Sequence, residues 1–254
     1  IRYNNLYFAY YYFNFKEIYV MSVFITGGYG HIGSWIAYLF AQSNQDVIIY
    51  DINSKCPEYL ENYKEKINFI QGDVLDFAKL TKVIKEYQHD IEGIIHTSAI
   101  MAEFVPKNPY YNTMLNVTGL LNILELSRIF EIKKIVFTST GAVYGKQSGK
   151  AKEESGINPQ DLYAASKASA EFIGIQYANT FQTDFRIGRL YFVYGPGKMP
   201  STFFTLYQLT FGILEGLKGL TSDKGSDQLL DFTYILDAAQ GIYLLFKKEN
   251  PKHR

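Results

Sequence analysis

The chain has 254 residues, and its 25 Lys and Arg balance its 25 Asp and Glu, so the formal net charge at pH 7 is zero. This length allows one large α/β domain with a full core and room for a small appended lobe. The balanced charge gives no indication of a basic face for nucleic acid or an anionic membrane surface, and we expect neither as a partner. The only cysteine is Cys56, which excludes an internal disulfide framework and suits the reducing cytoplasm.

Residues 1–20 differ in composition from the rest of the chain. They contain nine aromatic residues and have neither a clean apolar core nor a small-residue cleavage site, so they fit a signal peptide poorly. We expect them to be an atypical aromatic extension ahead of a natural start at Met21. No run of about 18 apolar residues occurs in the sequence, which therefore predicts no transmembrane helix.

Strand-length apolar runs alternate with longer amphipathic segments over residues 21–195. We expect strands at 22–26, 46–51, 67–71, 92–97, 133–139 and 184–190. We expect helices between them at 31–44, 76–88, 110–130 and 161–181. This alternation is typical of βαβ units whose parallel sheet is covered by helices on both faces. The fold class is therefore α/β, with a doubly wound Rossmann-type sheet that binds a dinucleotide.

The alternation weakens after Pro196. Residues 200–217 are expected to form a helix, 218–228 a loop rich in Gly, Ser and Asp, and about 236–248 a last helix. We therefore expect residues 196–228 to form a small C-terminal substrate-binding lobe and 229–248 to rejoin the Rossmann domain. The lobe is expected to be truncated, because the sequence stops without a further strand.

A glycine-rich turn follows the first predicted strand and opens the first predicted helix. Gly28, Gly30 and Gly33 satisfy G-x-G-x-x-G, which permits a tight turn, a close approach of the backbone to a pyrophosphate and close packing of helix on strand. The start of the helix then offers free N–H groups and a positive dipole end. A purely structural turn is the weaker interpretation, given this placement. The predicted dinucleotide contacts are Gly27, Gly28, Gly30, His31, Ile32 and Gly33.

Acidic residues follow the next two predicted strands. Asp51 ends the second, where its carboxylate would accept hydrogen bonds from the adenosine ribose and repel a 2′-phosphate, so NAD is favoured over NADP. Asp73 and Val74 follow the third strand, where Asp73 is suited to the adenine amino group. The alternative is that Asp73 caps the next helix.

Tyr163 and Lys167 lie four residues apart at the start of a predicted helix, so the phenol and the ammonium share one face. A free tyrosine has a pKa of about 10, but a nearby cation favours the phenolate and lowers that value. Such a pair alone is more often a surface pair than a catalytic one. Residues 137–145, FTSTGAVYG, add hydroxyl groups at the end of the fifth strand, on the carboxyl edge where open α/β sheets bind ligands.

The motifs follow one another in a specific order over residues 21–254. The chain carries TGGYGHIG, Asp51, GDVLD, IIHTSA, NVTGLLNILE, TSTGAVYG, YAASK, RLYFVYGPG and DFTYILDAA. This order resembles that of the extended short-chain dehydrogenase/reductases of the NAD-dependent epimerase/dehydratase family, which includes UDP-glucose 4-epimerases. The resemblance implies an enzyme with NAD as cofactor, a nucleotide sugar as substrate, and a homodimer formed through the helices at 110–130 and 161–181.

The resemblance also implies a catalytic triad of Thr140, Tyr163 and Lys167, with Ser139 as the adjacent alternative to Thr140. Thr140 would bind the substrate oxygen, and Tyr163 would take the hydroxyl proton as hydride passes to the nicotinamide. Lys167 would keep Tyr163 reactive and bind the nicotinamide ribose.

For other positions the resemblance implies a role in the site less specifically. Ser98 and Ala99 would line the nicotinamide side and Asn116 would support the site, with plain packing as an equal alternative for each. Phe192 and Tyr234 are expected at the substrate, and no metal ligand is expected.

Three positions depart from the family pattern. Phe192 stands where epimerases commonly have an asparagine, and Leu230 where an arginine usually grips the diphosphate, so two polar contacts to a nucleotide sugar are missing. The pair Gly141-Ala142 stands where the dehydratases have Asp-Glu, whose glutamate is the base for water elimination, which argues against dehydration.

Epimerisation of a nucleotide sugar through transient oxidation is the favoured function. A dehydrogenase or reductase acting on a smaller or more apolar hydroxyl substrate is the enzymatic alternative, which Phe192 and Leu230 suit. An NAD-binding protein or fragment without activity is the alternative from another class.

Overall fold

The computed structural model describes residues 21–147, 149–197, 214, 216 and 230–249. The extension at 1–20, nearly all of the helix expected at 200–217 and the loop expected at 218–228 lie outside these described residues. Among the residues that are described, no helix is long and apolar enough to cross a membrane.

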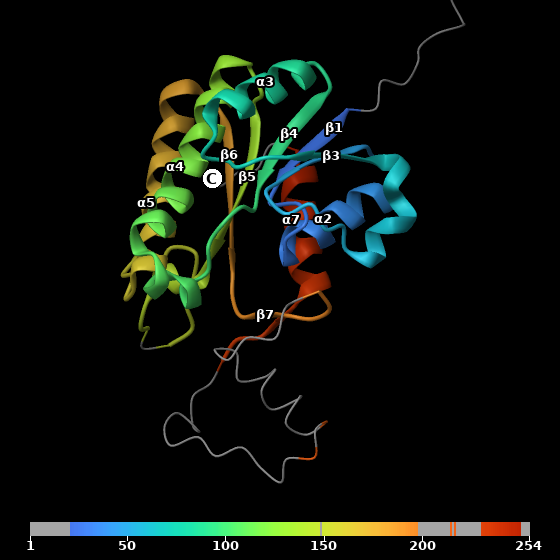
Figure 1. The fold of residues 1–254 in the computed structure, drawn as a ribbon. Helices are drawn as coiled ribbons and strands as arrows, with labels where there is room; N and C mark the ends of the chain where they lie inside the picture. Colours follow the sequence, from blue (N-terminus) through green and yellow to red (C-terminus); the bar gives the residue numbers. More distant parts are fainter. Residues whose placement is uncertain (1–20, 148, 198–213, 215, 217–229, 250–254) are drawn as a thin grey trace, which may run out of the picture.

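Six parallel strands form the central sheet (Figure 1). They are β1 (Ser22–Thr26), β2 (Val47–Asp51), β3 (Ile67–Gln71), β4 (Ile91–His96), β5 (Lys134–Thr140) and β6 (Asp184–Leu190). Their order across the sheet is β3-β2-β1-β4-β5-β6. Strands β1 to β3 are added toward one edge and β4 to β6 toward the other, so the order switches at the boundary between β1 and β4. Such a switch point is where doubly wound sheets bind ligands. The predicted doubly wound sheet is confirmed, and each expected strand lies within one residue of the observed one.

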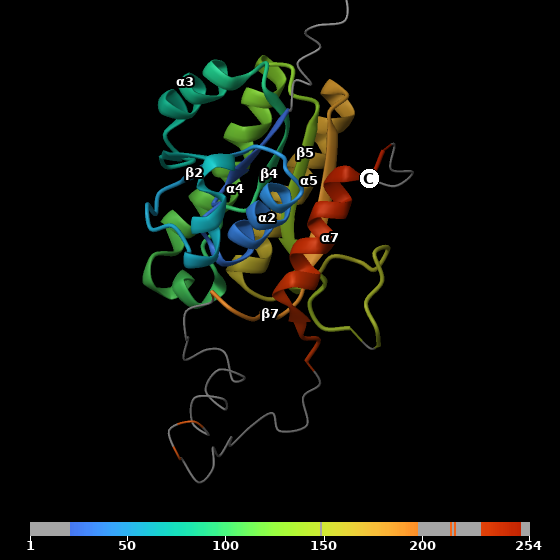
Figure 2. The same cartoon turned by 90° about the vertical axis from the view of Figure 1, so that its right-hand side faces the viewer.

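Helices cover both faces of the sheet (Figures 1 and 2). One face carries α3 (Phe77–Tyr87), α4 (Pro109–Ile129) and α5 (Leu162–Phe181), and the other carries α2 (His31–Gln42) and α7 (Ile235–Lys247).

Alternation along the strands supplies both cores. Phe24 of β1 packs under α3, α4 and α5, whereas its neighbours Val23 and Ile25 pack under α2 and α7. Successive side chains of a strand point to opposite faces, so a sheet covered on both sides needs apolar residues throughout. All five residues of β1 and all five of β2 are buried accordingly.

Short elements connect the sheet to the site. Within the described part of the chain, 3-10 segments lie at Glu58–Lys66, Ala102–Lys107 and Gly141–Tyr144. In addition, β7 (Val193–Tyr194) pairs in parallel with β8 (Thr233–Tyr234), which leads directly into α7. None of these was expected from the sequence, because a two-residue strand or an irregular 3-10 segment shows no clear hydrophobic period.

An aromatic cluster joins α2 to its neighbours. The ring of Trp35 stacks on that of Tyr59 with centroids 4.1 Å apart, and its Nε1 donates a hydrogen bond to the carbonyl oxygen of Pro196 at 3.0 Å.

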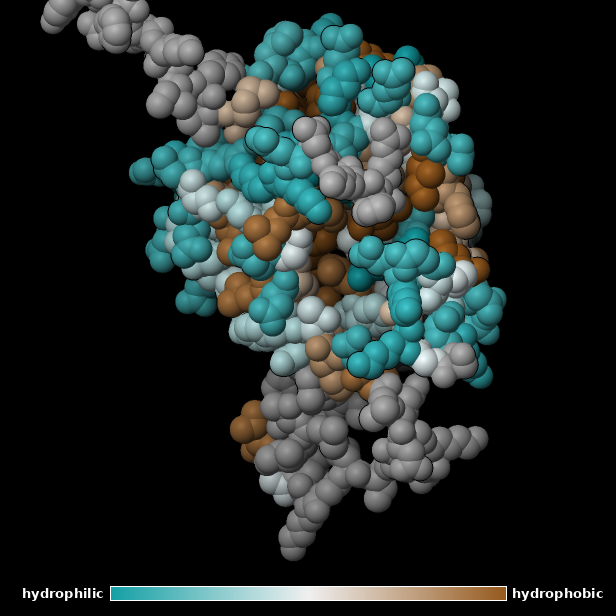
Figure 3. Space-filling model, turned by 180° about the vertical axis from the view of Figure 1, so that it is seen from behind, coloured by the Kyte–Doolittle hydropathy of each residue, from teal (hydrophilic) through white to brown (hydrophobic). Residues whose placement is uncertain are grey.

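Figure 3 shows the molecule from behind, where hydrophilic residues cover much of the surface and apolar residues form smaller areas between them.

Candidate cofactor and active site

The carboxyl ends of the strands bring most of the predicted site residues to one edge of the sheet. These residues are the glycine turn after β1, Asp51 at the end of β2, Asp73 and Val74 after β3, Ser98 and Ala99 after β4, and Thr140 at the end of β5. The remaining ones come from Asn116 on α4, Tyr163 and Lys167 on α5, Phe192 between β6 and β7, and Tyr234 on β8. A ligand lying along this edge would meet segments that are far apart in the sequence.

The glycine turn is too closely packed to accommodate side chains. Gly27 has φ +68°, and a Cβ there would lie 2.8 Å from the backbone nitrogen of Ser98. A Cβ on Gly28 would lie 2.7 Å from a methyl carbon of Ile49, and one on Gly33 would collide with the carbonyl oxygen of Gly27. The missing side chains thus allow α2 to begin directly against the end of β1.

Thr97 holds this turn in place, although the sequence did not single it out. Its hydroxyl donates to the carbonyl oxygens of Thr26 at 2.7 Å and Gly27 at 3.1 Å. Thr97 belongs to the IIHTSA segment, but the segment does not indicate what its hydroxyl binds, so only the fold reveals this contact.

Helix α2 begins without a side-chain cap, unlike the three helices on the other face. Asp76, Asn108 and Asp161 accept hydrogen bonds from N–H groups in the first turns of α3, α4 and α5. Gly30, which precedes α2, has no side chain to do the same, and the fully described first turn of α2 contains no acidic residue. The N–H groups and positive end of α2 are therefore suited to an anion.

Asp51 is fixed beside this turn. One of its carboxylate oxygens accepts a hydrogen bond from the backbone nitrogen of Tyr29 and the other from that of Asn53, each at 2.9 Å. Each oxygen has a second lone pair for a further donor, such as a ribose hydroxyl. The glycine cradle, the uncapped helix and this carboxylate together fit an adenine dinucleotide with a free 2′-hydroxyl.

Asp73 does not cap α3, which corrects the structural alternative considered for it. The cap is Asp76, whose carboxylate accepts from the backbone nitrogen of Lys79 at 3.0 Å. Asp73 instead accepts from the backbone nitrogen of Leu75 at 2.9 Å and from the hydroxyl of Tyr111 at 3.3 Å.

Asn116 is buried and braces the segment that follows β4. Its side chain accepts from the backbone nitrogen of Ile100 at 2.9 Å, and it donates to the carbonyl oxygen of the same residue at 3.2 Å and to the hydroxyl of Ser166 at 3.0 Å. It thereby links α4, α5 and the stretch that contains Ser98 and Ala99.

Thr140 and Tyr163 meet where β5 ends and α5 begins. The hydroxyl of Thr140 interacts with that of Tyr163 and favours its phenolate, while the sulfur of Met101 lies 3.7 Å from the same phenol oxygen. Ser139, the alternative to Thr140, instead donates its hydroxyl to the carboxylate of Glu171. Of the two neighbouring hydroxyls, that of Thr140 therefore lies at Tyr163.

Lys167 is almost fully buried, with its ammonium 4.0 Å from the ring centroid of Phe137. Burial lowers the pKa of Lys167 to about 7, and Glu171 acts in the opposite direction. Burial raises the pKa of Tyr163 to about 12, against the effect of Thr140. The sequence predicted a lowered pKa for Tyr163 because of Lys167, and this direction is wrong for the structure, since desolvation outweighs the neighbouring groups.

The buried Glu171 and the partly buried Arg189 form an ion pair that no sequence pattern predicted. The Glu171 carboxylate is fully buried and accepts from the Arg189 guanidinium at 2.7 Å. The available signal was spacing, since Tyr163, Lys167 and Glu171 recur every four residues and so share one face of α5.

The predicted substrate residues lie in an aromatic cluster. Phe192 and Phe232 are 47% and 41% exposed, with ring centroids 6.1 Å apart, and Tyr194 packs 5.5 Å from Tyr234. The half-buried Leu230 belongs to the segment that leads into β8. Aromatic rings and Leu230 therefore lie beside the exposed Asp231 on this side of the site. Among the described residues, no group of three His, Cys, Asp or Glu side chains is placed to hold a metal ion.

Comparison with known proteins agrees with this architecture. Residues 23–254 match the NAD dependent epimerase/dehydratase family. The chain is 31% identical over 229 residues to the UDP-glucuronate 4-epimerase of Thermodesulfobacterium geofontis, a match that covers 85% of this chain and 69% of that protein.

Solved structures show the same relationship. The UDP-N-acetylglucosamine 4-epimerase from Methanobrevibacter ruminantium M1, in complex with UDP-N-acetylmuramic acid, matches with a TM-score of 0.81 and 28% identity, over 90% of this chain and 74% of that one. The UDP-glucose 4-epimerase from Thermus thermophilus, in complex with NAD, matches with a TM-score of 0.77 and 27% identity, over 90% and 76%. The chain therefore belongs to the NAD-dependent epimerase/dehydratase family of extended short-chain dehydrogenase/reductases.

Proposed function

We propose that the protein is an NAD-dependent epimerase of a nucleotide sugar, with Thr140, Tyr163 and Lys167 as its catalytic triad. The observation that carries this proposal is the meeting of Thr140 and Tyr163 on the sheet edge that also holds the glycine turn. The relatives named as epimerases of UDP-sugars support the substrate class.

The glycine turn, α2 and Asp51 would hold NAD. The first turn of α2 would bind the pyrophosphate, and Asp51 would bind the adenosine ribose and repel a 2′-phosphate. Asp73 and Val74 would lie on the adenine side, and Ser98 and Ala99 on the nicotinamide side. When bound, NAD supplies the chemistry of accepting a hydride from a substrate carbon and returning it.

The triad would move the proton that accompanies this chemistry. The phenolate of Tyr163 takes the proton of a substrate hydroxyl during oxidation, and the phenol returns it when the carbonyl is reduced. Thr140 donates a hydrogen bond to the same substrate oxygen and orients it. Lys167, in its ammonium form, favours the phenolate of Tyr163 because a nearby cation stabilises an anion.

Incubation with catalytic amounts of NAD and a panel of UDP-sugars tests this function. We expect one sugar to be converted into its epimer without accumulation of NADH. We also expect the same preparation to bind NAD, which titration calorimetry measures. Binding of NAD without conversion of any substrate would instead identify a non-catalytic NAD-binding protein.

A dehydrogenase or reductase is the second candidate, and the aromatic cluster favours it. Phe192 and Phe232 present apolar surface, and Leu230 stands where the family pattern has an arginine for a diphosphate. A smaller or more apolar hydroxyl substrate would suit these residues. Stoichiometric accumulation of NADH with such a substrate, and none with nucleotide sugars, would select this function over epimerisation.

We also propose a homodimer formed through α4 and α5. Large apolar side chains are exposed on these two helices, namely Tyr110, Ile129, Leu162, Phe172 and Phe181. Sedimentation velocity at several protein concentrations tests the dimer, and a constant monomer mass would contradict it. We propose the cytoplasm as the compartment, which the single cysteine suits.

A further inference from the structure

Glu171 occupies a position from which it can act on the proposed triad. It lies one helical turn beyond Lys167 on α5, and its side chain is fully buried. Lys167 and Glu171 both face β5, because the ammonium contacts the ring of Phe137 and the carboxylate accepts from the hydroxyl of Ser139. Phe137 and Ser139 are two apart on the strand and therefore share one face.

The carboxylate of Glu171 joins three segments of the site. It accepts from Ser139 on β5 and, in a two-pronged ion pair, from Nε and Nη2 of Arg189 on β6 at 3.0 and 2.7 Å. Ser139 and Arg189 are direct neighbours in the sheet register. Arg189 in turn donates to the hydroxyl of Tyr144 at 2.7 Å, which fixes the short segment that follows Thr140.

Lys167 needs a negative charge nearby, since a buried ammonium is strongly destabilised unless it is paired. The titratable and charged groups around it are Tyr163 and Glu171 on α5, His96 on β4 and, behind Glu171, Arg189 on β6. His96 is buried and neutral at pH 7, because burial lowers its pKa to about 3. Of these groups Glu171 is the carboxylic acid, and without it the buried Lys167 and the partly buried Arg189 would be two cations with no carboxylate between them.

We propose that Glu171 is a positioning residue of the active site. Its carboxylate holds Ser139 so that the adjacent Thr140 stays at Tyr163, and its negative charge, one helical turn away, favours the ammonium form of Lys167. The inference rests on the proposed roles of Tyr163 and Lys167, and it adds a fourth residue that touches neither substrate nor cofactor.

Two substitutions at this position separate charge from shape. Glu171→Gln keeps the size and much of the hydrogen bonding but removes the charge, whereas Glu171→Asp keeps the charge on a shorter side chain. Asp184→Asn is the matched control, because Asp184 is also a carboxylate paired with a buried arginine, Arg186, but it lies at the amino end of β6.

Titration of the Lys167 side chain by NMR, with ¹³C-labelled lysine and assignment from Lys167→Met, needs neither NAD nor a substrate. In Glu171→Gln we expect the pKa of Lys167 to fall by about one unit, the scale on which loss of a nearby charge acts. In Glu171→Asp the pKa of Lys167 should stay close to its value in the parent protein. Asp184→Asn should leave the Lys167 titration unchanged. This measurement stays decisive even if no nucleotide sugar is turned over.

The pH profile of turnover adds a functional readout. With less charge on Lys167, the phenolate of Tyr163 is less favoured, so in Glu171→Gln the rising limb should move to higher pH by about one unit. Turnover at pH 7 should then fall by about tenfold.

A second variant, expected to change the pKa of Lys167 in the opposite direction, covers the case in which Glu171→Gln does not fold. Arg189→Gln removes the competing cation and leaves Glu171 to Lys167 alone, so the pKa of Lys167 should rise. A Lys167 titration that responds to neither substitution, or that responds equally to Asp184→Asn, would show Glu171 to be a purely structural residue and overturn the proposal.

Discussion

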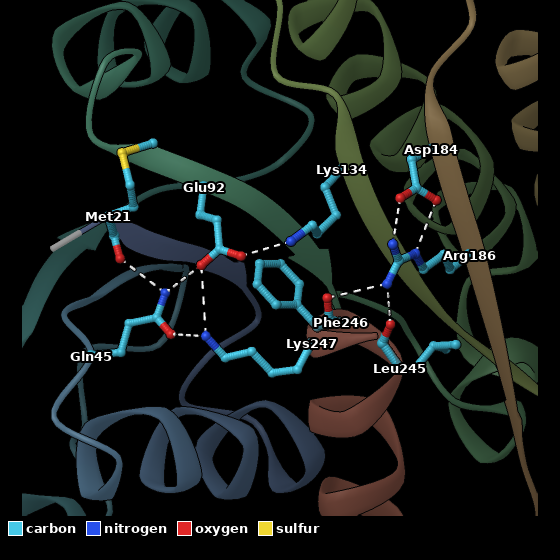
Figure 4. A network of polar contacts seen from close by, with 9 residues as sticks. All are labelled: Met21, Gln45, Glu92, Lys134, Asp184, Arg186, Leu245, Phe246 and Lys247. Carbon is cyan, nitrogen blue, oxygen red and sulfur yellow. Dashed lines mark hydrogen bonds and ion pairs between the residues drawn. The ribbon is translucent and has the colours of Figure 1, made fainter. Parts of the chain in front are cut away.

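The two ends of the sheet use polar groups in opposite ways. At the carboxyl ends, the first turn of α2 has no side-chain cap, and Lys167 is buried one helical turn from the carboxylate that pairs with Arg189. At the amino ends, the polar groups bond to one another (Figure 4). Glu92 pairs with Lys134 at 2.6 Å and accepts from Gln45 at 2.8 Å.

The amino-end network anchors α7 to the sheet. This helix runs opposite to the strands, so its last residues reach the starts of β5 and β6 (Figure 4). Arg186 donates to the carbonyl oxygens of Leu245 and Phe246 and pairs with Asp184, while Lys247 contacts Gln45 at 2.5 Å. Satisfied buried groups stabilise a fold, whereas groups left open are free to act on a ligand. The difference indicates that substitutions at one end should change chemistry and those at the other stability.

Tyr163→Phe should have the largest effect. Loss of the phenol removes the proton carrier, so we expect turnover to fall by about a thousandfold, within the usual range for a general acid-base residue. NAD affinity and unfolding free energy should stay close to those of the parent protein. Steady-state kinetics, calorimetry and chemical denaturation measure the three quantities. The control is Tyr243→Phe, which removes an exposed hydroxyl on α7, and full turnover by Tyr163→Phe would refute the triad.

Arg186→Met should come next and act on stability alone. It leaves Asp184 and two carbonyl oxygens without the buried guanidinium, and breaking such a pair costs about 3 kcal/mol of unfolding free energy. Urea denaturation measures this loss. Turnover per folded molecule should be unchanged, so a fall in turnover comparable to that of Tyr163→Phe would contradict the division between the two ends.

His96 makes a smaller, pH-dependent difference at the carboxyl end. It is fully buried, its Nδ1 contacts the hydroxyl of Thr26 at 2.7 Å, and its Nε2 has no hydrogen-bond partner among the described residues. Burial lowers its pKa from 6.5 to about 3, so the unfolded chain binds the proton more readily between these values. The stability contribution is therefore complete above pH 6.5 and is lost as the pH falls.

Comparison with His96→Gln isolates this contribution from those of other groups. Between pH 7 and pH 5 the parent should lose about 2 kcal/mol more unfolding free energy than the variant. Urea denaturation at each pH measures the unfolding free energy of both proteins. If the two unfolding free energies change in parallel with pH, His96 binds its proton in the folded state.

Glu92→Gln should have the smallest effect. Burial raises the pKa of Glu92, but hydrogen bonds from Lys134 and Gln45 outweigh this effect and hold the pKa below its usual range. A carboxyl of this kind stabilises the fold above its unfolded pKa, and that stability is lost as the pH falls. Because the pair is partly exposed, we expect a loss of about 1 kcal/mol at pH 7 by thermal denaturation. A loss that persists unchanged in acid would mean that the charge is not its cause.

Local sequence patterns predicted the carboxyl end far better than the amino end. The strands and the glycine turn are contiguous motifs with a period or a fixed spacing, so the sequence alone placed Asp51 and Thr140 at the sheet edge. The network that includes Gln45 and Lys247 joins residues about 200 positions apart, and nothing in either neighbourhood marks the partner.

Burial was the other quantity that spacing did not reveal. The interval from Tyr163 to Lys167 placed both on one face of α5, but the pKa of Tyr163 depends on how completely the surrounding elements exclude water. The same holds for Glu171, whose spacing was visible although its partner Arg189 was not. The catalytic and binding roles of these residues stay predictions until they are measured.

Trp35 gives the protein a built-in optical probe. It is the only tryptophan in the chain, it lies on α2 two residues after Gly33, and it contacts both Tyr59 and the carbonyl of Pro196. Its emission therefore originates from one place, the junction between the proposed phosphate-binding turn and the point where the chain leaves the sheet. Titrating ligands while recording this fluorescence would follow events at that junction without any label.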